Sequence, residues 1–221
     1  MVDIQYNKSM IDLIIFGVGG LSKDVHFIVD YINSIKSTFN LRGFLDDNKN
    51  QPELINGVPY LGSSDYIKTI DFKAHLVVAV SNPIVIKKIV KLGSDNPFIE
   101  FPNLIHPNAI IDHQFLRIGK GNIINASCII SRNVVIGDFN IFNNNACIGH
   151  DVEIGHMNTF SPKAQISGNV IIGNENFFGL NASIVQNKSV GNFNFVGACS
   201  LLTKSLKDNR KVFGIPARNL I

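Results

Sequence analysis

Two adjacent side chains, His150 and Asp151, are the strongest candidates for acid–base chemistry in this sequence. A neutral imidazole can remove a proton from a nucleophile near neutral pH, and a carboxylate can orient the ring. From these residues alone, the competing interpretation is a surface histidine in a turn. The pair therefore predicts a general base if the fold brings a substrate to it.

A second histidine, His156, lies six residues after His150. Two histidines suggest a metal site, but a catalytic zinc ion takes three protein ligands and the sequence offers no third at a fitting spacing. We therefore expect His156 to face solvent or an interface. Cys128, Cys147 and Cys199 form no CxxC pair, so we expect free thiols, with Cys128 and Cys147 structural rather than sites of a covalent acyl-enzyme.

A glycine-rich turn follows the first apolar run of the chain, at residues 12–16. Gly17, Gly19 and Gly20 occupy this turn, before a stretch with helical periodicity. Between a strand and a helix, such a turn lets backbone amides approach a diphosphate. The same turn often serves only the packing of helix on strand, so the motif alone is weak.

Polar residues also follow two later apolar runs. Asp46 and Asp47 end the run at residues 41–45, where a carboxylate could accept the ring N–H of uracil or thymine, or simply form a polar turn. Ser81 and Asn82 end another buried run and are candidates for contact with the same ligand.

The elements that must position these residues alternate between strand and helix over residues 11–96. Such alternation predicts a parallel sheet, whose ligands lie at the carboxyl ends of the strands. The expected strands lie at residues 12–16, 41–45, 58–60 and 75–80, with one helix after the first strand and another after the last.

The second half of the chain is a hexapeptide repeat. Every sixth residue from Ile118 to Leu202 is large and apolar, and glycine is the commonest residue after it. Three hexads form a longer period of eighteen residues, which predicts about five triangular coils of a parallel β-helix. Residues 101–117 would form an irregular first coil, and residues 212–218 would end the repeat. One register of the longer period contains only asparagine: Asn122, Asn140, Asn158, Asn176 and Asn194.

Composition argues against several other classes. The 221 residues carry a net charge of only +3 without a long basic run, so we expect neither nucleic acid nor an anionic membrane as a partner. No segment reaches the roughly 18 apolar residues of a membrane span. The first ten residues lack the apolar core of a signal peptide, and the cysteine count is odd, so we expect a cytoplasmic protein.

Seven short motifs, in one order along the chain, together resemble those of the nucleotide-sugar and sialic acid acetyltransferases (NeuD/PglD type) of the left-handed β-helix superfamily. The resemblance implies a Rossmann-like α/β domain at residues 1–100 that binds a nucleotide sugar. It also implies a left-handed parallel β-helix at residues 101–221 that binds acetyl-CoA between the subunits of a homotrimer. The motifs are GVGG at 17–20, GFLDD at 43–47, IHPNA at 105–109, IGHD at 148–151, FSP at 160–162, SGN at 167–169 and FGIPA at 213–217.

The same resemblance assigns roles to individual residues. It makes His150 the catalytic base, with Asp151 beside it, and places the backbone amide of Gly168 at the thioester carbonyl. It implies that Leu180 and Ala198 line the groove for the pantetheine arm.

Two further residues complete the set of candidates, and two positions depart from the family pattern. Lys204, in a basic cluster after the last coil, is a candidate for the phosphates of acetyl-CoA, although such a cluster is more often a solvated surface. Asn143 is a further candidate for contact with the substrate. Leu21 stands where the family often has a histidine after the paired glycines, and Thr159 where it commonly has a second histidine before the Ser-Pro step.

Together these observations predict an N-acetyltransferase that acts on a UDP- or dTDP-linked 4-amino-4,6-dideoxy sugar. The sugar amine would attack the thioester of acetyl-CoA directly, with no metal. O-acetylation of sialic acid or another sugar is the alternative within this class. A zinc-dependent enzyme of the γ-carbonic anhydrase type and a non-catalytic nucleotide-sugar-binding module are the alternatives from other classes.

Overall fold

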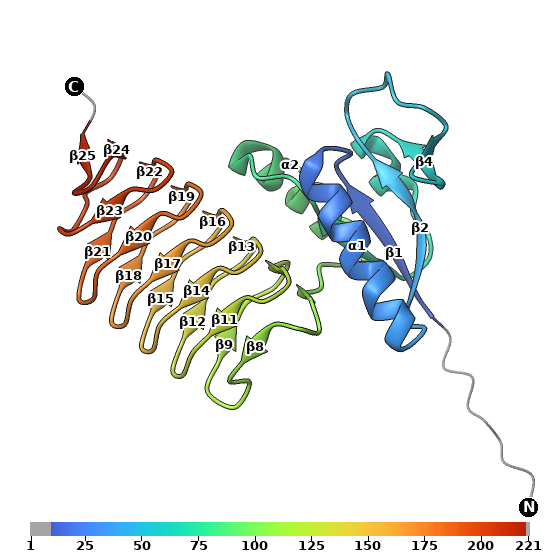
Figure 1. Ribbon diagram of the computed structural model, residues 1–221. Coiled ribbons are helices and arrows are strands. Elements are labelled where there is room, and N and C mark those ends of the chain that lie inside the picture. Colours follow the sequence, from blue (N-terminus) through green and yellow to red (C-terminus); the bar gives the residue numbers. More distant parts are fainter. Residues whose placement is uncertain (1–9, 220–221) are drawn as a thin grey trace, which may run out of the picture.

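A computed structural model describes residues 10–219, which form an α/β domain followed by a triangular solenoid (Figure 1). The parallel sheet of the first domain ends with β6 (Ile99–Glu100), and the solenoid begins with β7 (Leu104–Ile105). Within the described residues, no helix is both long enough and apolar enough to cross a membrane.

The first domain is a Rossmann-like sheet with a helix on each face, as the alternating pattern predicted. The strand order is β3-β4-β2-β1-β5-β6, and all neighbours are parallel except the β3–β4 pair. The first strand is apolar on both sides, because alternate residues face opposite helices. Its elements are β1 (Ile11–Phe16), α1 (Gly20–Ile35), β2 (Phe39–Leu45), β3 (Leu54–Ile55), β4 (Val58–Gly62), the 3-10 helix η1 (Ser64–Thr69), β5 (Ala74–Val78), α2 (Pro83–Ser94) and β6.

The order of these strands creates a crevice at their carboxyl ends. The chain leaves β1 toward β2 on one side, whereas β5 pairs with β1 on the other side. Loops after β1 and β5 therefore diverge, and this is where open α/β sheets bind their ligands.

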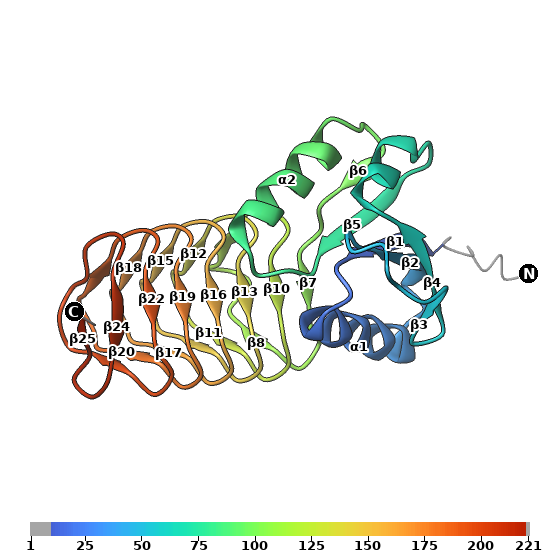
Figure 2. The same ribbon diagram turned by 90° about the horizontal axis from the view of Figure 1, so that it is seen from above.

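The second domain is a left-handed parallel β-helix with three sheets, which we call sheets I, II and III, as the hexads predicted (Figure 2). Almost every strand has two residues, and the second points inward. Sheet I contains β7, β10 (Ile123–Ile124), β13 (Ile141–Phe142), β16 (Thr159–Phe160), β19 (Phe177–Phe178), β22 (Phe195–Val196), β24 (Lys211–Phe213) and β25 (Arg218–Asn219). Sheet II contains β8 (Ile110–Ile111), β11 (Ile129–Ile130), β14 (Cys147–Ile148), β17 (Gln165–Ile166), β20 (Ser183–Ile184) and β23 (Leu201–Leu202). Sheet III contains β9 (Arg117–Ile118), β12 (Val135–Ile136), β15 (Glu153–Ile154), β18 (Ile171–Ile172) and β21 (Ser189–Val190).

Equivalent side chains stack along the β-helix axis. All hexad residues from Ile124 to Leu202 are buried, and only Ile118, at the irregular first coil, is partly open. Phe142, Phe160 and Phe178 stack with ring centroids 4.8 and 4.9 Å apart. The core is therefore one continuous column that each coil extends.

The buried asparagines form a second column. The side-chain oxygen of each accepts hydrogen bonds from the backbone and the side chain of the next; for Asn158 and Asn176 both distances are 2.9 Å. The Asn158 amide also donates to the Gly173 carbonyl at 2.9 Å. The column thus satisfies buried polar groups that the solenoid corners would otherwise leave unpaired.

Each corner also contains one residue with a left-handed backbone. For side chains other than Asn, Asp or Gly this conformation costs about 1 kcal/mol or more, and asparagine is accordingly frequent there. The corner between sheets III and I differs, because it has Phe139, Met157 and Phe193 in this conformation. Phe139 and Met157 pack against the first domain, where Phe139 meets Phe101 edge-on at 5.2 Å. Phe193 remains 52% exposed.

The first domain packs on sheet I and on the III–I corner. Ile123 and Ile141 of sheet I join the core beneath α1, and Lys87 of α2 pairs with Glu175 at 2.6 Å. The turns of the corner between sheets II and III lie along the opposite side of the solenoid, away from α1 and α2 (Figure 1).

The expectation that residues 212–218 end the repeat is wrong in part. Val212 is buried in β24, which pairs in parallel with β22, and only β25 turns back antiparallel. The final coil pairs Val196 with Val212 and Val190 with Leu206, so it is sixteen residues long instead of eighteen. Counting in steps of six from Leu202 therefore no longer identifies the inward-facing residues.

Replacing Asn158 by alanine tests the asparagine column. The change removes the acceptor of Asn176 and leaves its buried N–H unpaired, so we expect unfolding free energy to fall by about 2–4 kcal/mol. Urea denaturation measures this loss. Glu153→Ala, on the exposed face of sheet III, is the control and should change stability by less than about 0.5 kcal/mol. Equal effects of the two changes would contradict the role of the column.

Candidate active site

His150 lies at the corner between sheets II and III, in the turn from β14 to β15. Asp151 has a left-handed backbone (φ 57°), which brings its carboxylate back toward the preceding ring. The distance from His150 Nδ1 to Asp151 Oδ2 is 2.7 Å. Since a carboxylate can only accept, Nδ1 carries the proton and Nε2 is left as the basic nitrogen of the neutral ring.

Asn133 completes this arrangement from the preceding coil. Its side-chain amide donates to the second oxygen of Asp151 at 3.0 Å. The pKa of the Asp151 carboxyl is lowered from its ordinary value of 3.8, first by the hydrogen bond from His150 and then by that from Asn133. The carboxylate is therefore charged at neutral pH and holds the imidazole in one orientation.

The other side of the His150 ring lies against Gly168 of the next coil. A Cβ atom at Gly168 would come within 2.6 Å of both Cε1 and Nε2 of the ring. Its φ is not in the left-handed region, so the backbone itself does not require glycine, but a side chain here would displace the His150 ring from its present position. The basic nitrogen and the backbone of Gly168 thus face the same space.

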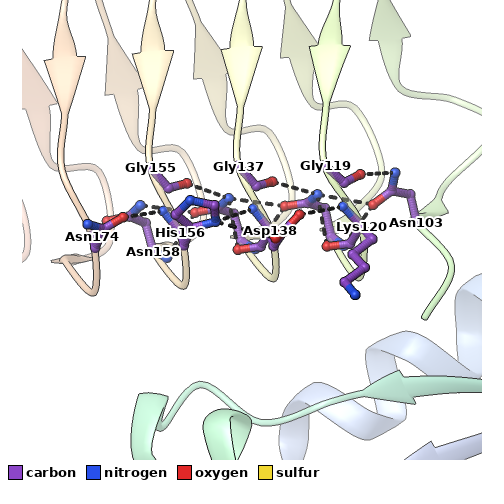
Figure 3. A network of polar contacts seen from close by, with 11 residues as sticks. Asn103, Gly119, Lys120, Gly137, Asp138, Gly155, His156, Asn158 and Asn174 are labelled. Atoms are coloured by element: carbon purple, nitrogen blue, oxygen red, sulfur yellow. Dashed lines mark hydrogen bonds and ion pairs between the residues drawn. The ribbon is translucent and has the colours of Figure 1, made fainter. Parts of the chain in front are cut away.

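The backbone N–H of Gly168 donates to no group within residues 10–219. The III–I corner shows the contrast, because side chains there accept the equivalent N–H groups in a continuous series (Figure 3). The N–H of Lys120 donates to Asp138 at 2.8 Å, that of Asp138 to His156 Nδ1 at 2.9 Å and that of His156 to Asn174 at 2.8 Å. A free donor beside a base therefore exists at His150 and not at His156.

His156 consequently has a structural place in the ladder of Figure 3. Its Nδ1 accepts a backbone N–H, so this nitrogen is unprotonated and engaged. Among the described residues, no group of three or more His, Cys, Asp or Glu side chains is placed to hold a metal ion.

The remaining candidates in the β-helix lie at two corners. Lys204 is exposed at the same corner as His150 and Gly168, since the strands before them pair in register. Leu180 and Ala198 are exposed at the I–II corner, at the opposite edge of sheet II.

Asn143 lies at the same I–II corner as Leu180 and Ala198. Its amide donates to the Phe160 carbonyl at 3.1 Å. The residues expected to bind acetyl-CoA therefore lie at two different corners of one chain. Gly168 and Lys204 are at the II–III corner, whereas Leu180 and Ala198 are at the I–II corner.

The substrate candidates of the first domain all lie at the carboxyl ends of the strands. Gly17 has a φ of 111°, and a Cβ there would meet the Ala79 carbonyl at 2.8 Å, so this glycine serves packing. Around Gly19 and Gly20 a Cβ would meet nothing within 4 Å. These two glycines leave open space at the N-terminus of α1, where backbone amides attract anions.

Asp46 and Asp47 follow β2 and already have partners. Asp46 accepts the N–H of Val18 at 3.1 Å and so braces the glycine-rich turn. Asp47 accepts the N–H of Ser64 at 3.0 Å and pairs with Lys88 of α2 at 2.6 Å. These contacts, the Lys88 hydrogen bond foremost among them, offset burial and lower the pKa of Asp47. Asp47 is exposed, and its carboxylate keeps lone pairs for a further donor.

Ser81 and Asn82 are exposed beyond β5, and Asn82 caps α2 by accepting the N–H of Ile84 at 3.0 Å. Asn133 and Lys88 were not among the residues predicted from the sequence. The eighteen-residue period could have found Asn133, which precedes Asp151 by one coil. No sequence signal links Lys88 to Asp47, because their contact depends on the packing of α2.

Comparison with known proteins agrees with this architecture. Residues 12–92 match the family described as the PglD N-terminal domain. WeeI from Acinetobacter baumannii AYE matches with a TM-score of 0.84 and 28% identity over 96% of this chain and 100% of that one. The acetyltransferase domain of PglB from Neisseria gonorrhoeae has a TM-score of 0.84 and 26% identity over 96% and 100%. No curated protein sequence shows significant similarity.

A third structure, the perosamine N-acetyltransferase of Caulobacter crescentus, shares the fold with a TM-score of 0.86 and 23% identity, over 96% of this chain and 98% of that one. The fold and these matches place the chain among the acyltransferases of the left-handed β-helix superfamily. The match of residues 12–92 to the PglD N-terminal domain family, together with these structures, confirms the resemblance seen in the motifs.

Replacing His150 by alanine should raise the pKa of Asp151 toward 3.8, because the largest cause of its lowering is then absent. A carbon-13 NMR titration of the carboxyl measures the change, and Asn133→Ala should give a smaller rise. In the unchanged protein, the hydrogen bond between His150 and Asp151 stabilises the folded state above pH 3.8. This contribution to stability is lost as the pH falls through the lowered pKa of Asp151. An unchanged Asp151 pKa in His150→Ala would show that the two side chains do not pair in solution.

Proposed function

We propose that the protein transfers an acetyl group from acetyl-CoA to the amine of a nucleotide-linked sugar. The observation that carries this proposal is the basic nitrogen of His150 beside the free N–H of Gly168. The names of the matched structures support it: the gonococcal domain binds acetyl-CoA, and the Caulobacter crescentus enzyme binds CoA and GDP-perosamine. A zinc-dependent reaction has no corresponding observation in its favour.

The proposed reaction needs only the groups at this corner. The sugar nitrogen attacks the thioester carbon while His150 Nε2 takes its proton, and Asp151 stabilises the resulting imidazolium. The N–H of Gly168 donates to the carbonyl oxygen as it becomes negative. The C–S bond then breaks, and the proton passes from His150 to the leaving sulfur.

The completed site requires a second copy of the chain. His150 lies on the side of the solenoid away from its own first domain, and Leu180 and Ala198 lie at the other edge of sheet II. A homotrimer that packs these two corners against each other would form the acetyl-CoA groove, with Lys204 near the phosphates. The outward residues Ile110 and Ile129 of sheet II are 66% and 42% exposed, which suits an interface.

For the acceptor we propose a UDP- or dTDP-linked 4-amino-4,6-dideoxy sugar made for glycan synthesis in the cytoplasm. The open N-terminus of α1 suits a diphosphate, and the free lone pairs of Asp47 suit the ring N–H of a base. The cysteines within the described residues are all free thiols, which fits a reducing compartment.

Thiol release from acetyl-CoA tests the proposed function. UDP-, dTDP- and GDP-linked 4-amino sugars and sialic acid are offered in turn as acceptors. We expect release with one amino sugar and a fall in kcat of about 10²–10⁴-fold in His150→Ala. The matched control is His156→Asn, because asparagine already occupies this ladder at Asn174 and Asn192 and the variant should keep its activity.

Retention of activity in His150→Ala would refute the assigned base. Release with sialic acid alone would replace the proposed N-acetylation by O-acetylation. A folded protein that releases no thiol with any acceptor would contradict the proposed function.

Mixing two inactive variants tests the shared site. His150→Ala removes the base, whereas Gly20→Glu places a negative charge in the open space where the diphosphate should bind. In trimers formed at random from equal amounts of the two variants, about a quarter of the interfaces would join an unchanged His150 from one copy to an unchanged first domain from the other. Activity should therefore return. No recovery from mixed trimers, or a monomer in light scattering, would contradict a site built from two copies.

A further inference from the structure

A cleft lies between the first turn of α2 and the outer face of the later coils. Its volume is about 390 Å³, within the range of about 300–1,000 Å³ typical of small-molecule sites. Asn82 and Ile84 line one side, and Phe177, Phe193 and Phe195 line the other. None of the roles assigned above explains this apolar surface.

Phe193 is the most informative residue of the cleft. Its backbone is left-handed (φ 58°), a conformation that disfavours a bulky side chain. Phe139 and Met157, at equivalent positions, offset this cost by packing in the core of the first domain. Phe193 and the opposite Ile84 remain 52% and 78% exposed. Lys163 and Cys199 share the left-handed backbone, so the conformation alone does not distinguish Phe193. Its large apolar side chain does, because it is left exposed opposite Ile84, where a ligand in the cleft would cover it.

The base of the cleft is formed by the edges of stacked aromatic rings. Phe177 and Phe195 stack with ring centroids 5.1 Å apart and planes at 8°. They belong to the outer face of sheet I, where α1 and the first domain cover Ile123 and Ile141 but not Phe195. These ring edges form an apolar surface that can contact the C–H groups of a sugar ring.

The cleft connects the two regions that the proposed reaction must join. At one end lies Asn82, on the β5 side of the crevice that would hold the nucleotide. Toward the other edge of sheet I, Phe177 and Phe195 precede Leu180 and Ala198 by three residues. Three residues of extended chain span about 10 Å. A ring bound on the aromatic surface would thus lie close to the groove proposed for the acetyl arm.

We propose that this cleft binds the hexose of the nucleotide sugar and selects a 6-deoxy sugar, with the C6 methyl group between Phe193 and Ile84. This inference rests on the proposed function. With the base at the β2 end and the diphosphate at α1, a linear ligand places its sugar toward β5 and Asn82. Glu175, fixed by Lys87 at 2.6 Å, gives the cleft a polar rim.

Calorimetric titrations with sugar nucleotides and with free nucleoside diphosphates test this subsite. The probes are UDP-, dTDP- and GDP-linked 4-amino-4,6-dideoxyhexoses, their 6-hydroxy analogues, and UDP, dTDP and GDP. We expect Phe193→Asn and Ile84→Ser to weaken binding of the preferred 6-deoxy sugar nucleotide by about tenfold, with little change for the free diphosphate. The preference for the 6-deoxy sugar over its 6-hydroxy analogue should shrink accordingly.

The melting temperature separates this effect from damage to the fold. Asparagine suits a left-handed backbone, so Phe193→Asn should melt at the same temperature as the unchanged protein or higher. Lys163→Asn, also at a left-handed corner but outside the cleft, should leave both affinities unchanged.

Two outcomes overturn the subsite. Unchanged affinity for the sugar nucleotide in both cleft variants, with acetylation intact, would refute the cleft and leave the proposed function standing. Failure of every diphosphate and sugar nucleotide to bind would refute both.

Discussion

The contact between the His150 ring and Gly168 is the constraint on which the proposed site depends. It exists because the solenoid places residues eighteen apart directly above one another, so that the ring from one coil lies over the backbone of the next. Any side chain at Gly168 would displace the ring. The register of the fold, rather than a loop, therefore sets the distance between the base and the free N–H.

Among the described residues, the III–I corner has hydrogen bonds that the corner of His150 lacks. At the III–I corner, side chains accept the backbone N–H groups of successive coils, and the buried asparagines satisfy the adjacent positions. At the corner of His150 the ring Nδ1 is paired with Asp151 instead, and the N–H of Gly168 stays free. Gly168 is buried, and a buried donor without a partner is expected where a ligand supplies the acceptor.

Much of this could be predicted from the sequence, because the solenoid repeats at a fixed period. The hexads predicted triangular coils, whereas the burial of the asparagine register was not predicted. The period failed at the final coil, where Val212 pairs sixteen residues after Val196, and at the irregular first coil, where Ile124 pairs nineteen residues after Ile105. Contacts between the domains carry no such period, so the pairing of Lys88 with Asp47 and the covering of Phe139 by Phe101 were not foreseen.

Apart from the neighbouring Asp151, little in the sequence separates His150 from His156 without the family resemblance. Both are the third residue of a hexad, and both precede a residue with a left-handed backbone. Their difference lies in hydrogen-bond partners: one ring accepts a backbone N–H, and the other donates to a carboxylate beside an unpaired donor.

A crystal structure with bound acetyl-CoA would test the central claim most directly. The account predicts that the thioester carbonyl oxygen lies about 3 Å from the Gly168 nitrogen, with Nε2 of His150 facing the same carbonyl carbon. Acetyl-CoA bound with its carbonyl oxygen away from Gly168, or at the corner of His156, would contradict it.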